Sequence, residues 1–309
     1  MAPRRWKPPS HIDERLPSAG SPASDEAVAR ATTQSEAWSL FAPLQVPNCG
    51  DWLAAGQPGE RDRRGQTFAQ FARPGPHRSF PTRRKATIEL VPFGATGLSN
   101  EHLELLAECV RAHYCLPCRI GTTLSAEAAL AAGRGREAGY GPQVTTEAVH
   151  ADLARAVRPD AFLTLAITGH DLTKEAPEWN FVFGEASASN STGVFSFARY
   201  RDGATSDAHF LRRCCMVLVH EVGHLFGIKH CVWARCIMNG SNHLEESERR
   251  PFAFCPTDLR KLSDTLARAT GSFDPAARER AIGAFFEQAG FQTDLAESEK
   301  RLALVSLRL

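Results

Sequence analysis

The 309-residue sequence predicts an α/β (α+β) protein in which a twisted, mixed β-sheet packs against helices. Apolar runs of strand length alternate along the chain with segments whose apolar residues recur at helical spacing. Hydrophobic residues make up 43% of the chain, enough for one well-filled core or two smaller ones. No apolar run reaches the roughly 18 residues that a transmembrane helix needs, so no membrane association is expected.

The expected strands are short runs rich in apolar and β-branched residues. In chain order they are 86–94, 115–121, 160–172, 179–187 and 193–200. A Ser/Asn-rich turn joins the last two. An extended peptide can pair with the strand at the edge of a sheet. The candidates for that edge are 193–200 and the segment just before it, and the sequence does not choose between them.

The expected helices carry recognisable boundary residues. Ser99 is a plausible N-cap for a helix over 99–114, and Pro159 ends a helix over 145–157. A long apolar-faced helix over 214–227 ends at Gly227. Further helical stretches are expected over 257–270 and 275–309.

Composition divides the chain into three parts: an irregular N-terminal arm over 1–85, a folded domain over 86–270 and a helical extension over 271–309. The arm holds eleven of the nineteen prolines, and Arg61–Lys85 contains eight Lys or Arg residues and one acid. Such a basic stretch could contact nucleic acid, but a solvated linker is the preferred interpretation.

The net charge of +1 does not point to nucleic acid or to an anionic membrane as a partner. The first twenty residues lack the apolar segment of a secretory signal, so an intracellular protein is expected. The nine cysteines are then expected to be reduced thiols or metal ligands.

Potential metal ligands are concentrated in HEVGHLFGIKH, which begins at His220. On a helix, His220 and His224 stand on one face and can reach one zinc ion, while Glu221 can reach a water on that ion. Gly227 permits a sharp exit from the helix, and His230 then completes a three-histidine site. A fourth position left open to water is typical of catalytic zinc.

The histidine string and the following Met238 form the metzincin signature. The longer pattern HExxHxxGxxHCx4CxM, followed by CP, resembles the archaemetzincins. The strings DWL (51–53), GVFSFARY (193–200), GSNHLEE (240–246) and RRPFAFCP (249–256) are also similar to that family. The resemblance extends over about residues 38–262 and implies a metzincin-like catalytic domain within 86–270.

The resemblance implies that the three histidines bind catalytic zinc, that Glu221 is the general base and that Met238 forms the Met-turn beneath them. It assigns Cys231, Cys236 and Cys255 to a second, structural zinc site. The fourth family cysteine falls at Asp258, where the chain departs from the pattern. A carboxylate can bind zinc, so a Cys3Asp site is expected. The alternative is three buried free cysteines that pack as small hydrophobic side chains.

Other cysteines and one histidine are weaker candidates. Cys49 resembles the thiol latch of some metzincins, but an ordinary loop cysteine is preferred. Cys115 and Cys118 form a CxxC pair that is expected to be buried and inert. Packing is the expected role of Cys214 and Cys215, and His243 is expected to be a polar loop residue.

The sequence therefore predicts a zinc-dependent metallopeptidase whose substrates are peptides or proteins. The alternative is a weak or inactive zinc-stabilised module that binds peptides or proteins, and the intact Glu221 argues against it. A third hypothesis, nucleic-acid binding through the basic arm, ranks last. The substrate, the choice between internal and terminal cleavage and the oligomeric state are not determined by the sequence.

Overall fold

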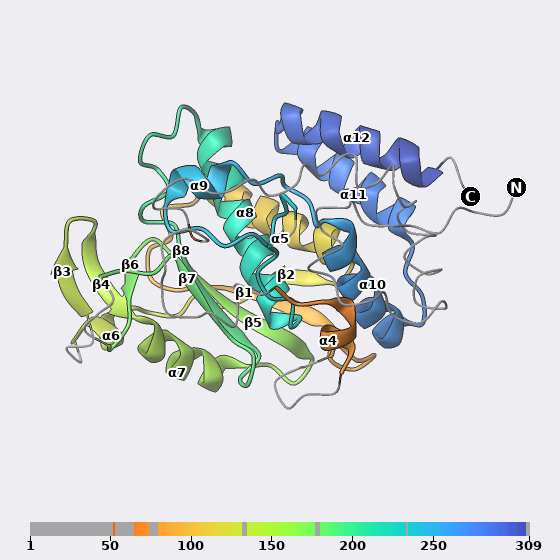
Figure 1. Ribbon diagram of the computed structural model, residues 1–309. Helices are drawn as coiled ribbons and strands as arrows, with labels where there is room; N and C mark the ends of the chain where they lie inside the picture. The colour runs from red at the N-terminus through yellow and green to blue at the C-terminus, as the bar shows by residue number, and fades with distance from the viewer. Residues whose placement is uncertain are drawn as a thin grey trace, which may run out of the picture. The chain divides into compact units, whose positions relative to one another are not determined.

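Figure 1 shows the computed structural model of the chain, which describes Trp52 and residues 65–73, 80–131, 135–176, 180–232 and 234–306. The chain forms two compact units. We call Pro76–Gly227 the sheet unit, and Met1–Gly75 together with Ile228–Leu309 the helical unit. Most of the predicted arm, including Cys49, lies outside the described residues. The predicted domain boundaries at 85 and 270 stay a prediction.

A five-stranded mixed sheet forms the centre of the sheet unit, with the strand order β2-β1-β5-β8-β7. Its strands are β1 (Thr87–Pro92), β2 (Cys118–Ile120), β5 (Ala161–Thr168), β7 (Gly184–Ser187) and β8 (Thr192–Ser196). Neighbouring strands are parallel except at the edge, where β7 pairs antiparallel with β8. All eight residues of β5 are buried, as expected of a central strand covered on both faces.

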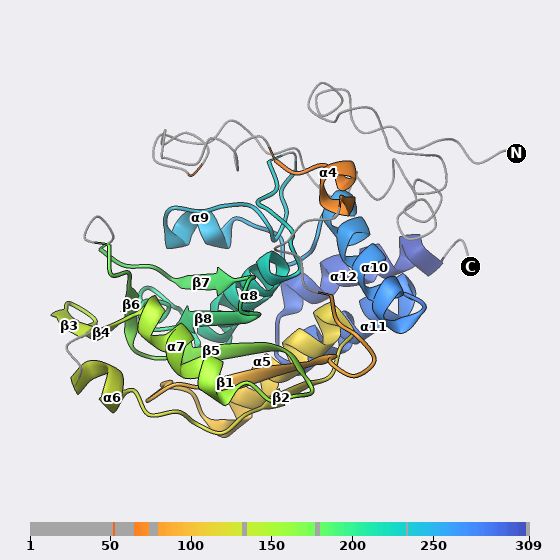
Figure 2. The ribbon, with the colours of Figure 1, turned by 90° about the horizontal axis from the view of Figure 1, so that it is seen from below.

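The sheet packs against helices, as the sequence predicts, and the structure places them on both of its faces. The helices α5 (Asn100–Tyr114) and α8 (Asp207–Leu225) pack together on one face, and α7 (Thr146–Ala156) packs against the other. In Figure 1, α7 lies below the strands and α8 above them, and Figure 2, seen from below, has α7 on the near side. The predicted cap Ser99 accepts a hydrogen bond from the backbone N–H of His102.

The predicted strand 160–172 is in fact two strands in different sheets. It breaks after β5, and β6 (Asp171–Thr173) joins a second sheet with β3 (Gly135–Ala138) and β4 (Gly141–Thr145). Gly169 lies at the break, where its N–H donates to the carbonyl of Ala95 over 2.8 Å. A Cβ on Gly169 would lie 2.8 Å from that oxygen, so the chain can turn here only at glycine.

The helical unit is built from α4 (Phe68–Ala72), α9 (Leu244–Glu248), α10 (Pro256–Thr270), α11 (Pro275–Gln288) and α12 (Gln292–Ser306). Within it, α4 packs against α10, and α11 packs against α12. The predicted helical stretch 275–309 is divided at Gly290, whose φ of 74° ends α11. The side chains of Phe252, Phe285, Phe286 and Phe291 pack around this turn.

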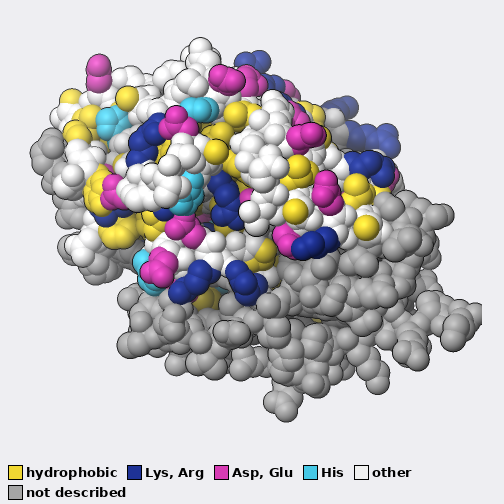
Figure 3. All heavy atoms as spheres, turned by 90° about the horizontal axis from the view of Figure 1, so that it is seen from above, with side chains coloured by type: hydrophobic (Ala, Val, Ile, Leu, Met, Phe, Trp, Pro, Cys, Tyr) yellow, Lys and Arg dark blue, Asp and Glu magenta, His cyan; other side chains and the backbone are white. Residues whose placement is uncertain are grey.

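Charges of both signs are interspersed over the described part of the face drawn in Figure 3. The whole sequence likewise has nearly equal numbers of basic and acidic residues, with a net charge of +1. No helix among the described residues combines the length and the hydropathy that a membrane span requires. The predicted intracellular location stays a prediction.

A buried ion pair joins the two sheets of the sheet unit. Asp171 of β6 is fully buried and accepts hydrogen bonds from Nε and Nη2 of Arg199, both over 2.8 Å. Its Oδ2 also accepts a bond of 2.7 Å from Nε2 of Gln143 in β4. The small sheet is therefore held to the segment that follows β8 by charge-assisted hydrogen bonds.

Asp171→Asn is expected to destabilise the protein by about 3 kcal/mol, because it leaves the Arg199 guanidinium without its counter-charge. Urea denaturation of the variant and the wild type measures the difference. Asp207→Asn is the control, since the carboxylate of Asp207 is exposed and pairs with exposed Arg201, and it should cost less than about 1 kcal/mol. Equal effects of the two substitutions would contradict a structural role for the buried pair.

Candidate metal centres

Two histidines stand one turn apart on α8, as the sequence predicts. The Nε2 atoms of His220 and His224 lie 3.1 Å apart, and their ring centroids are separated by 4.6 Å. Two imidazoles bound to one zinc ion in tetrahedral geometry have nitrogens about 3.3 Å apart. The pair is therefore already close to the arrangement that a shared metal ion requires.

The position of this pair is fixed by contacts that α8 makes inside the sheet unit. The hydroxyl of Tyr114 on α5 donates a hydrogen bond to the carbonyl of Val219, the residue before His220. The Tyr114 ring also stacks on Phe226 at a centroid distance of 4.9 Å, and Phe162 of β5 meets Phe226 edge-on. These aromatic contacts anchor the end of α8 that carries the histidines.

Glu221 lies beside the edge strand of the sheet. A Cβ built on Gly184 of β7 would be 3.5 Å from Cγ of Glu221 and only 2.8 Å from Cδ1 of Phe195. Only glycine at position 184 allows β7 to pair with β8 without a collision with the Phe195 ring. The edge strand beside Glu221 is thus β7, which lies in the segment before 193–200. The strand β8 lies inside the sheet.

The helix ends as predicted. Its last residue is Leu225, and Gly227 follows with a φ of 82° while its N–H donates to the carbonyl of His224 over 2.8 Å. This left-handed conformation turns the chain out of the helix. Gly227 is the last residue of the sheet unit, and His230 is the third residue of Ile228–Leu309, the second segment of the helical unit.

In the helical unit, Trp52 packs against the segment that carries His230. Their ring centroids are 4.6 Å apart, with the planes at 66°. The N–H of Trp52 donates to both carboxylate oxygens of Glu246, over 2.9 and 3.1 Å. A Cβ on Gly240 would lie 2.3 Å from the Trp52 ring, so the ring lies directly on this glycine. The sequence offered DWL only as part of the family resemblance and did not reveal this contact.

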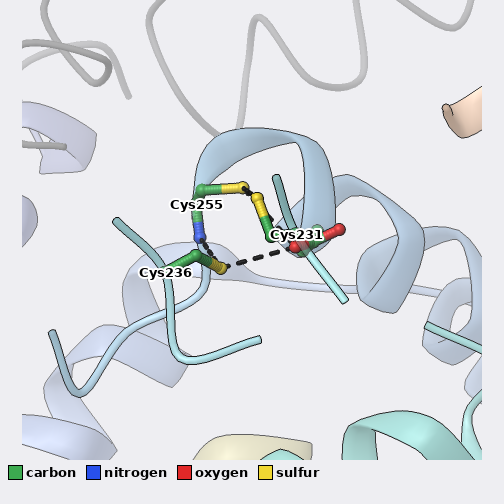
Figure 4. A group of neighbouring side chains, drawn as sticks. Cys231, Cys236 and Cys255 are labelled. Carbon is green, nitrogen blue, oxygen red and sulfur yellow. Dashed lines mark hydrogen bonds between the residues drawn. The ribbon is translucent and has the colours of Figure 1, made fainter. Parts of the chain in front are cut away.

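Four predicted ligands come together in the helical unit. Cys231, Cys236, Cys255 and Asp258 are fully buried, and their donor atoms all lie within 4.8 Å of one another. Figure 4 shows the sulfurs of Cys231 and Cys255 pointing toward each other, at 3.7 Å. Oδ2 of Asp258 lies 3.4 Å from Sγ of Cys236 and 3.6 Å from Sγ of Cys255.

These distances fit a tetrahedral zinc ion. With ordinary zinc–ligand bond lengths, two sulfurs lie about 3.8 Å apart, and a sulfur and a carboxylate oxygen about 3.5 Å apart. The backbone also favours thiolate at Cys236, whose Sγ accepts N–H bonds from Cys255 over 3.1 Å and from Met238 over 3.5 Å. The donor set and its spacing therefore suit a closed structural metal site.

Burial has a strong effect on the protonation of this cluster. It raises the pKa of the Cys236 and Cys255 thiols well above their usual value, because desolvation penalises the thiolate. Burial also raises the pKa of Asp258 to about 6, against the opposing charge of Lys261. A bound cation would reverse this preference by stabilising the thiolates.

Two residues that support the cluster were not predicted from the sequence. Asn239 accepts a hydrogen bond from the N–H of Cys236 and donates to the carbonyls of Cys231 and Ala234, all within 2.9 Å. Lys261 is buried and donates to Oδ1 of Asp258 over 2.7 Å. The i,i+3 spacing of the Asp–Lys pair was the one sequence signal available for the second contact.

The remaining candidates have ordinary structural positions. His243 caps α9, accepting the N–H of Glu246 over 3.3 Å, which agrees with a polar loop residue. Cys214 and Cys215 are fully buried, as predicted. The predicted buried pair of Cys115 and Cys118 is wrong for Cys115, which is exposed. Its φ of 51° ends α5 and directs it away from the core.

The chain is similar to known peptidases. The model of peptidase family M54 matches residues 143–264, which include both groups of candidate ligands. The chain is 34% identical over 262 residues to archaemetzincin-2 of Rattus norvegicus, covering 74% of this chain and 71% of that protein. It is 31% identical over 257 residues to archaemetzincin-2 of Homo sapiens, covering 72% of this chain and 69% of that protein.

A lower similarity, 26% over 287 residues, relates the chain to archaemetzincin-1 of Homo sapiens, covering 81% of this chain and 55% of that protein. The crystal structure of archaemetzincin from Methanopyrus kandleri matches with a TM-score of 0.49 and 29% identity, over 61% of this chain and 99% of that chain. The identity to the rat protein extends over most of both sequences. The chain therefore belongs to the archaemetzincin family of zinc metallopeptidases.

Proposed function

We propose that the chain hydrolyses peptide bonds at a site in which His220, His224 and His230 hold a zinc ion and Glu221 is the general base. The observation that carries the proposal is the pair of Nε2 atoms 3.1 Å apart on α8, with Glu221 next to the first of them. When bound, zinc supplies Lewis-acid activation of water and of the scissile carbonyl. Five residues separate His224 from His230, and the left-handed turn at Gly227 lies among them.

In this proposal Glu221 takes a proton from the attacking water and passes it to the leaving amine. The edge strand β7 lies next to Glu221 and could align an extended peptide by backbone hydrogen bonds. Peptides or proteins are therefore the proposed substrates. A pure binding module would have no use for a carboxylate beside the histidine pair, which favours the enzyme over that alternative.

We further propose that Cys231, Cys236, Cys255 and Asp258 hold a second, structural zinc ion. Four protein ligands leave no open position for water, which separates this site from a catalytic one. The spacing of the sulfur and oxygen atoms supports this assignment over free packing cysteines.

Glu221→Gln is expected to keep zinc and to lower peptide cleavage by about 10²–10⁴-fold, because the amide cannot accept the proton. Mass spectrometry of a diverse peptide mixture measures cleavage, and elemental analysis measures zinc per chain. Glu101→Gln is the control, since Glu101 is an exposed residue of the first turn of α5. Cleavage by Glu221→Gln at the wild-type rate would rule out Glu221 as the base.

Gly184→Ala is expected to lower cleavage by about a hundredfold, because β7 must shift away from Phe195 and thereby move relative to Glu221. The kcat/KM of a peptide found to be cleaved by the wild type measures the effect. Gly139→Ala is the matched control, because a Cβ there meets nothing within 4 Å and its φ is not positive. If both variants cleave like the wild type, the position of β7 does not matter to the reaction.

A further inference from the structure

We propose that Lys261 is a positioning residue that enables a carboxylate to serve as the fourth ligand of the cysteine cluster. It would hold Asp258 through one oxygen so that the other oxygen faces the metal. This inference rests on the proposed second metal site. It concerns the position at which the chain departs from the four-cysteine pattern of its family.

The two oxygens of Asp258 have different partners. Oδ1 accepts a hydrogen bond of 2.7 Å from Nζ of Lys261. Oδ2 lies 3.4 Å from Sγ of Cys236 and 3.6 Å from Sγ of Cys255. A carboxylate held in this way presents one oxygen to the cluster and cannot turn both of them toward it.

The ion pair lies in the interior. The side chain of Lys261 is 1% exposed and that of Asp258 is 0% exposed. Burial of a charged lysine costs free energy unless an opposite charge lies beside it. The ammonium of Lys261 and the carboxylate of Asp258 therefore stabilise each other. Their mutual contact thus fixes the position of both side chains.

The charge of the ligand set gives Lys261 a second role. Three thiolates and a carboxylate carry four negative charges, and a divalent ion carries two positive ones. Lys261 reduces the remaining excess from two charges to one. In a buried site such an excess is expensive, so a nearby cation makes the ionised ligand set less costly.

Local structure places these groups on one face of α10. Cys255 occupies the N-cap, Asp258 lies in the first turn, and Lys261 is three residues further on. Cys255 makes no side-chain capping bond, and its N–H donates to Sγ of Cys236. The first turn of the helix is therefore used to build the cluster.

Co²⁺ substitution tests the proposal, because thiolate-to-cobalt charge transfer in the near ultraviolet comes from the cysteine cluster and not from a site of histidines. The purified full-length chain is freed of zinc by a chelator and titrated with Co²⁺, and zinc competition then gives the relative affinity. The variants are Lys261→Met, Asp258→Cys and the double substitution. The band intensity also reports on the number of thiolate ligands.

Lys261→Met is expected to weaken metal binding at the cluster by about 10–100-fold, as the loss of an outer partner of a ligand commonly does. In the Asp258→Cys background the same substitution should cost less than about threefold, because a thiolate needs no orientation by Lys261. This non-additivity is the signature of a positioning role. Equal losses in the two backgrounds would overturn the proposal.

Arg268→Met is the control for loss of an ion pair on the same helix. Arg268 pairs with Asp264 at the surface of α10, and its substitution should leave the cobalt band unchanged. If Lys261→Met does not fold, Lys261→Gln replaces it in the same comparison. Its amide is uncharged, so at least a threefold loss is expected beside Asp258 and none in the Asp258→Cys background.

Two further results would refute the inference in different ways. Tight cobalt binding by Lys261→Met, at or above the wild-type affinity, would show that Lys261 only packs, and the second site would stand. No thiolate–cobalt band in the wild type would show that the ion pair stands in place of a metal, and would remove the second site as well. Zinc-dependent peptide cleavage, lost in Glu221→Gln, would still support the catalytic site in either case.

Discussion

The candidate catalytic site depends on how firmly α8 is held against the five-stranded sheet. His220 is buried, and the side chains of Leu218, Val219 and Val222 around it are buried as well. The Tyr114 hydroxyl bonds the carbonyl of Val219, and the aromatic contacts of Phe226 fix the end of the helix. Metal binding then demands little rearrangement of His220 and His224, because their rings are already positioned by the core.

The same packing determines what lies next to Glu221. Gly184 of β7 has no side chain to collide with Phe195 of the paired strand β8, and at this point β7 also lies beside Glu221. In a general base the position of the carboxylate matters as much as its identity, since the proton transfer needs contact with the attacking water. The edge strand and Glu221 therefore lie together within the sheet unit.

The cysteine cluster brings three thiols and one carboxylate within the spacing of a metal site. A carboxylate is a harder donor than a thiolate, and the carboxylate of Asp258 carries a second oxygen that must be accommodated. In the helical unit, Lys261 donates a hydrogen bond to that oxygen. The side chain of Asn239 hydrogen-bonds the backbone of both Cys231 and Cys236 and so links the two ends of their loop. The residues around the cluster thus help to set the positions of the groups that could bind a metal.

The sequence by itself determined the elements whose signals are local. The helical spacing of His220 and His224, the cap at Ser99 and the exit at Gly227 depend on residues close in the chain, and the structure confirms all three. The cysteine pattern likewise identified all four members of the cluster. A short motif specifies its own geometry because the helix fixes the directions of its side chains.

Only the tertiary structure decided which distant residues meet. The strands β3 and β4 were missed because their polar residues and glycines carry no periodic apolar signal, and the start of β6 was predicted as part of one longer strand. The edge position of β7, the packing of Trp52 on Gly240 and the pairing of Lys261 with Asp258 within a buried cluster also depend on the packed structure. The physical reason is that burial and contact are properties of the packed chain, whereas periodicity and capping are already present in the local sequence.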